Sequence, residues 1–183
     1  MKSISEVANQ QLEWLEPRPL SMEYELRAGE ETIAALRFRS AFGSFATGEA
    51  GSLHGGPCGC WTFKRVGFFR THVTVRDCGT DKDIATFHNN TWSGGGTLLL
   101  SGGRRCAAST NYWATNLEFK NEAGELLLRI KSSSQLEFNG TLEIQPAARA
   151  MPELPWLVIL GWYLIVMMFN DAAAASASAA ALG

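Results

Sequence analysis

The feature that most constrains this chain is a run of sixteen residues near its end, residues 154–169, that carries no charge and no polar face. The run reads Leu-Pro-Trp-Leu-Val-Ile-Leu-Gly-Trp-Tyr-Leu-Ile-Val-Met-Met-Phe. A helix that is apolar on every side is not stable on a protein surface, so it is covered either by protein or by lipid. The rest of the chain decides between these two environments.

The composition is that of an ordinary globular protein, and 183 residues suffice for one domain with a substantial core. Sixteen basic and eighteen acidic residues give a net charge of −2, so we expect no binding of nucleic acid through overall charge. Residues 1–16 lack the basic start and apolar run of a secretory signal, so we expect a cytoplasmic location for the bulk of the chain. Cys58, Cys60, Cys78 and Cys106 show no repeating framework, which favours reduced thiols over a disulfide scaffold.

Between residues 22 and 145, apolar and polar residues alternate with the period of two that is typical of half-buried strands. The predicted strands are residues 22–28, 34–38, 61–66, 72–77, 84–88, 117–120, 126–131, 136–139 and 142–145, and more weakly 98–100 and 106–109. Asn139–Gly140 predicts a type I′ hairpin between the last two main segments, and Gly102–Gly103 predicts another hairpin. Residues 3–15 are expected to form one or two turns of amphipathic helix.

Alternating strands build a sheet with one dry face, and an open sheet of about ten to twelve strands also leaves two exposed edges. Closure into a barrel removes both problems, and at about eleven strands the interior is wide enough for a central helix. The apolar run would be about 24 Å long, against a barrel height of roughly 15–20 Å. We therefore predict a mainly β fold, a closed antiparallel barrel of about 10–12 strands with the hydrophobic C-terminal helix threading its interior.

This interpretation divides the chain into three parts. Residues 1–19 are an N-terminal segment with a short helix, and residues 20–171 are a single β-barrel domain that includes the central helix, residues 154–170. Residues 172–183 are a low-complexity tail of Ala and Ser, expected to be frayed or weakly helical.

The alternative is a C-terminally anchored membrane protein, in which the apolar run crosses a bilayer and the β-domain lies in the cytoplasm. A spanning helix usually needs about 20 apolar residues, and this run stops about one turn short, at Asn170 and Asp171. Extending it into the tail places Asp171 within the apolar zone, which costs about 2.5–3.5 kcal/mol near the bilayer centre and less near an interface. The length favours the barrel interior and leaves the membrane anchor open.

Many short antiparallel strands followed by one wholly apolar C-terminal helix, here ending Trp-Tyr-Leu-Ile-Val-Met-Met-Phe-Asn-Asp at Asp171, resemble the tubby-like superfamily. That superfamily includes tubby C-terminal domains, LURP-one-related proteins and phospholipid scramblases. The resemblance covers residues 22–171 and is one of architecture. It implies a barrel of about twelve strands around the helix, and a non-enzymatic module that works at membranes. No functional residue is carried over, because residues 145–153 lack the acidic calcium-binding segment of scramblases and no match to the tubby lipid-binding residues can be drawn.

The densest cationic and aromatic cluster combines Lys64, Arg65 and Arg70 with four aromatic residues, Trp61, Phe63, Phe68 and Phe69. Lysine and arginine pair with phosphate, and aromatic side chains enter the lipid interface, so the cluster predicts a site for an anionic lipid headgroup. The purely structural interpretation is that Trp61 and Phe63 fill the barrel while Lys64 faces water, because alternating strands produce this pattern without any ligand.

Arg104 and Arg105, beside the Gly102–Gly103 turn, form a second candidate cationic edge, whose simpler role is to solvate a hairpin. Residues 89–96 contain three consecutive glycines, but no helix follows them as a phosphate loop requires, so we expect an irregular strand connection.

A metal site would combine His54, Cys58 and Cys60 with a further cysteine, but Cys-Gly-Cys lacks the usual spacing of zinc ligands. No Gly-x-Ser-x-Gly elbow is present, and His54, His72 and His88 have no partner visible in the sequence. We therefore expect a non-catalytic module without metal or cofactor, which binds anionic lipid, a membrane surface or a protein partner.

Overall fold

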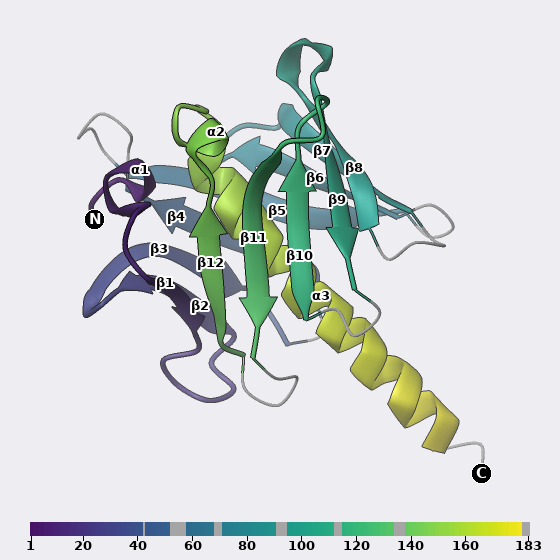
Figure 1. The fold of residues 1–183 in the computed structure, drawn as a ribbon. Coiled ribbons are helices and arrows are strands. Elements are labelled where there is room, and N and C mark those ends of the chain that lie inside the picture. Colours follow the sequence, from purple (N-terminus) through teal and green to yellow (C-terminus); the bar gives the residue numbers. More distant parts are fainter. Residues whose placement is uncertain are drawn as a thin grey trace.

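In the computed structural model, residues 1–41, 43–51, 58–67, 71–90, 95–111, 115–133 and 138–180 are described. Across these ranges, twelve antiparallel strands form one closed barrel around the C-terminal helix α3, Leu154–Ala180 (Figure 1). Along the chain the strands are β1 (Leu12–Leu15), β2 (Glu23–Ala28), β3 (Glu31–Phe38), β4 (Ala46–Ala50), β5 (Gly59–Val66), β6 (His72–Asp77), β7 (Asp83–Asn90), β8 (Gly95–Leu100), β9 (Arg105–Thr110), β10 (Asn116–Lys120), β11 (Leu126–Ser132) and β12 (Gly140–Ile144). The predicted barrel with a threaded helix is confirmed.

Each strand pairs with its neighbours in sequence, and the barrel closes where β12 pairs with β1. Because neighbours are antiparallel, all odd-numbered strands run toward the end at which α3 leaves the barrel. We name this the distal end; Arg65, at the end of β5, meets Asp171 of α3 there. The proximal end, where α3 begins, holds the short helices α1 (Ile4–Val7) and α2 (Pro146–Arg149) (Figure 1).

The barrel core is built around α3, in which every residue from Leu154 to Phe169 is buried except the half-buried Met168. Trp162 stacks on Trp14 of β1, with ring centroids 5.5 Å apart. The next residue, Tyr163, stacks on Phe38, and its hydroxyl donates a hydrogen bond to the Ser44 carbonyl at 2.6 Å. Burial of each large apolar side chain contributes about 1.5–3 kcal/mol, so this helix supplies much of the stability of the barrel.

Two glycines allow α3 to approach the sheet closely. A Cβ on Gly48 of β4 would lie 2.7 Å from Ile159, and a Cβ on Gly140 of β12 would lie 2.9 Å from the Trp162 ring. The predicted Asn139–Gly140 hairpin is therefore wrong, since Gly140 is the first residue of β12 and lacks a positive φ. This glycine does not form a turn but leaves space for the helix and for the Lys131 carbonyl of the neighbouring strand, which a Cβ would approach to 2.6 Å.

Further predictions near that hairpin have mixed outcomes. Of the predicted strand at residues 136–139, residues 136 and 137 lie outside the described ranges, while Phe138 and Asn139 lie in no strand. Phe138 instead contacts the rings of Tyr24 and Phe169 at the distal end. The Gly102–Gly103 hairpin is confirmed, with φ values of 77° and 81° in the connection between β8 and β9.

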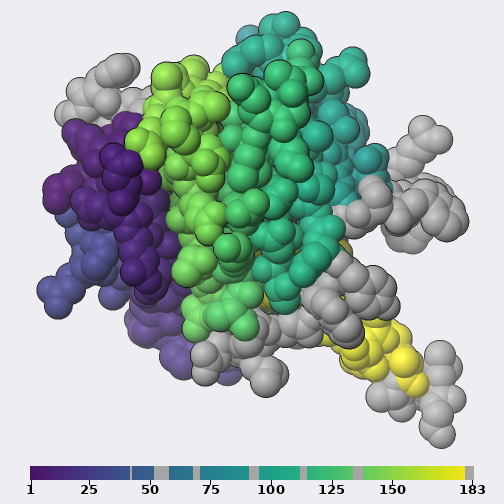
Figure 2. Space-filling model, in the orientation of Figure 1, coloured from purple at the N-terminus to yellow at the C-terminus, as the bar shows by residue number. Residues whose placement is uncertain are grey.

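Three segments differ from the sequence-based expectation. Residues 12–15 form β1, so the barrel begins inside the segment expected to precede it, and only Ile4–Val7 is helical there. Residues 46–50 form β4, which was not predicted. At the other end, α3 continues through the Ala and Ser tail to Ala180 (Figure 1). Figure 2 shows side chains of the strands covering α3, with its last turns projecting from the surface.

The expectation of reduced cysteines is wrong for two of the four. Cys60 on β5 and Cys78 after β6 form a disulfide, and their Cα atoms are 5.4 Å apart. The antiparallel pairing of β5 and β6 brings the two residues opposite each other, and the Cys78 amide donates a hydrogen bond to the Cys60 carbonyl. Cys58 is free and exposed, and Cys106 is free and buried.

Candidate functional site

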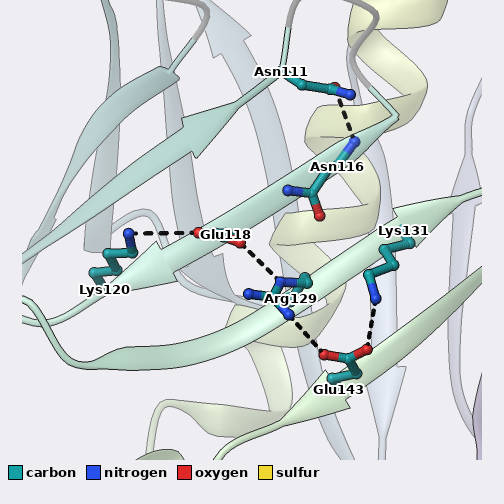
Figure 3. Close-up of polar contacts among 7 residues, drawn as sticks. All are labelled: Asn111, Asn116, Glu118, Lys120, Arg129, Lys131 and Glu143. Carbon is teal, nitrogen blue, oxygen red and sulfur yellow. Dashed lines mark hydrogen bonds and ion pairs between the residues drawn. The ribbon is translucent and has the colours of Figure 1, made fainter.

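Most charged side chains on the outside of the barrel are paired with each other. The largest network runs across β10, β11 and β12, where Glu118 and Glu143 alternate with three cations, Lys120, Arg129 and Lys131 (Figure 3). Hydrogen bonding from Arg129 lowers the pKa of Glu118, and hydrogen bonding from Lys131 lowers the pKa of Glu143. These cations already form ion pairs with carboxylates of the same molecule. Cations without such a pair are therefore better markers of a binding surface.

Within the described ranges, five basic side chains make no ion pair with another described residue. These are Arg39, Lys64, Lys82, Arg105 and Arg149. Their distribution is uneven: the first two lie at the distal end, near the ends of β3 and β5, and the others lie at the proximal end.

The predicted headgroup cluster is divided by the structure. Arg65 turns toward α3 and forms a bidentate ion pair with Asp171, with N–O distances of 2.6 and 3.0 Å. Hydrogen bonding to Asp171 raises the pKa of Arg65, so its guanidinium group stays charged. Lys64, on the opposite face of β5, is exposed to solvent, and Phe63 is buried in the barrel. Arg70, Phe68 and Phe69 lie outside the described residues.

The second predicted cationic edge lies at the proximal end. Arg104 forms an ion pair with Glu153, which directly precedes α3, and the Arg105 amide donates to the Glu122 carboxylate at 2.9 Å. Both arginines line a hollow of about 290 Å³ together with the buried thiol of Cys106. Because two carboxylates lie beside the two arginines, this hollow carries little net positive charge and is a poor anion site.

The distal end also exposes large apolar side chains. Leu20, in the connection between β1 and β2, is 92 % exposed, and Val66, at the end of β5, is 37 % exposed. Leu20 has a φ of 62°, a conformation that is strained for a bulky residue. The connection therefore presents this leucine to solvent from a strained backbone conformation. No sequence pattern marked Leu20 or Arg39, because their significance depends on which end of the barrel they share.

The last part of α3, residues 172–179, is a long exposed apolar element, which we name the helix extension. All of its residues are exposed, and all are Ala or Ser. The hydroxyls of Ser176 and Ser178 donate to the carbonyls of Ala172 and Ala174, each at 2.9 Å. Since the serines satisfy their polarity on the helix itself, the extension presents almost only methyl and methylene groups.

The histidines and cysteines of the described ranges are the residues to examine for catalysis or metal binding. His72 and His88 lie side by side with ring centroids 5.6 Å apart, and no hydrogen bond joins a described cysteine to either of them. The disulfide removes Cys60 from the metal site considered above, and His54 lies outside the described residues. Across those residues, no group of three or more His, Cys, Asp or Glu is placed to hold a metal ion.

Comparison of the chain with models of known protein families, with curated proteins and with solved structures found no match. The length and composition of α3 are sufficient for a membrane span, but 67 % of its most apolar window is buried inside the barrel. Geometry and charge at the distal end are therefore the basis for assigning a function.

Proposed function

We propose that this protein is a non-catalytic module that docks, through the distal end of its barrel, on membrane surfaces that contain anionic lipid. The observation that carries the proposal is the course of α3, which fills the barrel and then emerges as an exposed, uncharged helix extension. Unpaired Arg39 and Lys64 and exposed Leu20 lie at the same end. The resemblance to the tubby-like superfamily agrees with a non-enzymatic role at membranes.

The dimensions of the helix extension suit one leaflet of a bilayer. Eight residues of helix rise about 12 Å, and half of a typical hydrocarbon core is about 15 Å. Backbone polar groups in a helix are bonded internally, so the extension enters lipid without leaving amides unsatisfied. Alanine is only weakly apolar, so we expect this element to add to binding rather than to dominate it.

Electrostatic attraction supplies the remainder of the binding. Each Lys or Arg near an anionic surface contributes about 1 kcal/mol, and the attraction weakens as salt increases. Lys64 and Arg39 fill this role in our proposal. Arg65 and Arg104 are assigned to holding α3 in place, while Arg70 stays a prediction.

The tail-anchored alternative requires residues 154–169 to enter lipid, and the same residues form the barrel core. The two models differ in an extraction experiment. A docked protein is released from membranes by alkaline carbonate, whereas an anchored protein resists it.

Flotation of the full chain with vesicles tests the proposal. We expect binding to phosphatidylcholine vesicles that contain phosphatidylserine, little binding to phosphatidylcholine alone, and a decline as salt rises. Arg39→Gln with Lys64→Gln should reduce binding about tenfold or more, since two cations near the surface are lost. Lys82→Gln, an unpaired cation at the proximal end, is the matched control and should bind like the wild type.

Removal of the apolar contribution is tested separately with Leu20→Ser and Ala174→Asp, both at exposed positions. Each should weaken flotation without changing the thermal stability of the barrel. Binding that is absent under all lipid conditions, or indifferent to both sets of substitutions, would overturn the proposal and favour a protein partner at this end.

A further inference from the structure

A second hollow, at the proximal end, has no role in membrane docking. It measures about 480 Å³, within the range of about 300–1,000 Å³ that is typical of small-molecule sites. The connection between α1 and β1 forms one wall, β12 forms the second, and Arg149 of α2 completes it. Three consecutive residues with amide side chains, Asn9, Gln10 and Gln11, line the first wall.

The central observation is the state of Arg149. Its Nε atom is buried and has no hydrogen-bond partner, and the side chain makes no ion pair with any described residue. Arg149 as a whole is half-buried, but a buried N–H donor without an acceptor is costly, and folded proteins rarely retain one. Arg149 lines the hollow, so an oxygen anion there would give its unpaired guanidinium group a counter-charge. Guanidinium groups bind carboxylate and phosphate in bidentate geometry.

The carboxylates nearest this hollow have hydrogen-bond partners other than Arg149. Glu143 lines it, but its carboxylate accepts hydrogen bonds from Lys131 at 2.9 Å and Arg129 at 3.2 Å. Glu13 on the neighbouring strand accepts from the Gln11 amide at 2.6 Å. These carboxylates accept from other donors, whereas the Arg149 side chain has no hydrogen-bond or ion-pair partner among the described residues.

We propose that the hollow between residues 8–12, β12 and Arg149 binds a small molecule through a carboxylate or phosphate group. Arg149 holds the anionic oxygens, and the amides of Asn9 and Gln10 donate to the ligand from the rim. The site lies at the opposite end of the barrel from the docking surface, so either proposal stands or fails without the other.

Titration of the ¹⁵N-labelled chain, followed by NMR at low ionic strength, tests the site with two probes in separate arms, inorganic phosphate and succinate. We expect saturable shifts at the Arg149 Nε–H and at the side-chain amides of Asn9 and Gln10. Saturation by phosphate alone identifies a phosphate-bearing ligand, and saturation by succinate alone identifies a carboxylate. Either result supports the proposal, and the absence of saturable shifts with both probes overturns it.

Substitution separates specific binding from general attraction. Arg149→Gln should weaken binding about tenfold or more, because it removes a charged donor pair. Arg105→Gln, which removes an unpaired cation elsewhere at the proximal end, should leave binding unchanged. If Arg149→Gln does not fold, Arg149→Lys decides, since it keeps the charge but loses the bidentate fork and should still bind more weakly. Equal binding by wild type and the Arg149 variants would overturn the assignment.

Discussion

Arg65 and Asp171, which are 106 positions apart in the sequence, form a bidentate ion pair where α3 leaves the barrel. At the other end of the barrel, Arg104 pairs with Glu153 just before α3 begins. Each pair joins a barrel strand or hairpin to one end of the buried section of the helix. Two arginines that resemble ligand-binding residues in the sequence therefore pair with the two ends of the buried section of α3.

The distal pair should contribute modestly to stability. Asp171 is 55 % exposed and Arg65 is 27 % exposed, and partly exposed pairs are typically worth about 0.2–1 kcal/mol. We expect Arg65→Asp to lower the free energy of unfolding, and Arg65→Asp combined with Asp171→Arg to recover part of the loss. Urea denaturation of the two single variants and the double variant measures the coupling. A coupling near zero would mean that the pair does not hold the helix.

The sequence predicts a strand correctly where large apolar residues alternate with polar ones, as in β2, β5 and β6. The alternation does not reveal β4, because its inward residues are Ala46, Gly48 and Ala50, which are small where α3 packs closely against the strand. The apolar spacing of the short segment Leu12–Leu15 also suits a helix. Only its pairing with β2 and β12 shows that it is the strand β1.

The residues of the candidate site are harder to predict from the sequence, for a different physical reason. A cation's sequence neighbours do not show which carboxylate folding will bring to it. Arg65 and Arg104 find partners 106 and 49 positions away, whereas Lys64, next to Arg65, finds none among the described residues. The alternation of the strand places Arg65 inside and Lys64 outside, but the presence of Asp171 at the right depth is a property of the assembled barrel.

An introduced aspartate should destabilise the barrel when it lies in the buried section of α3, but not when it lies in the helix extension. Trp162 is fully buried against Trp14, so Trp162→Asp places an unpaired charge in the core at a cost of several kcal/mol. We expect loss of the cooperative thermal transition in near-ultraviolet circular dichroism. Ala173→Asp, on the exposed extension, is the control and should melt like the wild type. Retention of the transition in Trp162→Asp would show that the helix is not the barrel core.

Gly48 should be intolerant of even one added methyl group. A Cβ there would lie 2.7 Å from Ile159 and 2.8 Å from Phe63, which is closer than real Cβ contacts. Overpacking of this kind costs about 1–3 kcal/mol, so Gly48→Ala should lower the midpoint of urea denaturation. Thr47→Ala, on the outward face of the same strand, should cost less than about 1 kcal/mol. Equal effects would argue against close approach of α3 to β4.

The four cysteines predict a stepwise labelling pattern with iodoacetamide. Cys58 is exposed and should react in the native protein, while Cys106 is buried, and burial raises the pKa of its thiol, so little thiolate forms at neutral pH. Mass spectrometry should detect one label in the native state and two after unfolding. Four should appear only after reduction, since Cys60 and Cys78 form the disulfide. Four labels without reductant would contradict the disulfide, and two in the native state would contradict a closed barrel around Cys106.

The ion network across β10, β11 and β12 predicts how stability depends on acid pH (Figure 3). The pKa values of Glu118 and Glu143 are lowered from the ordinary value of 4.5 by hydrogen bonds from Arg129 and Lys131. A carboxylate with a lowered pKa in the folded state contributes stability above pH 4.5 that is lost as the pH falls through its folded value. Thermal unfolding from neutral to strongly acidic pH should therefore show a decline that is smaller in the Glu118→Gln and Glu143→Gln double variant. Glu30→Gln, which removes a charge in the connection between β2 and β3, should keep the full decline, and an identical decline in all three proteins would exclude the network as its source.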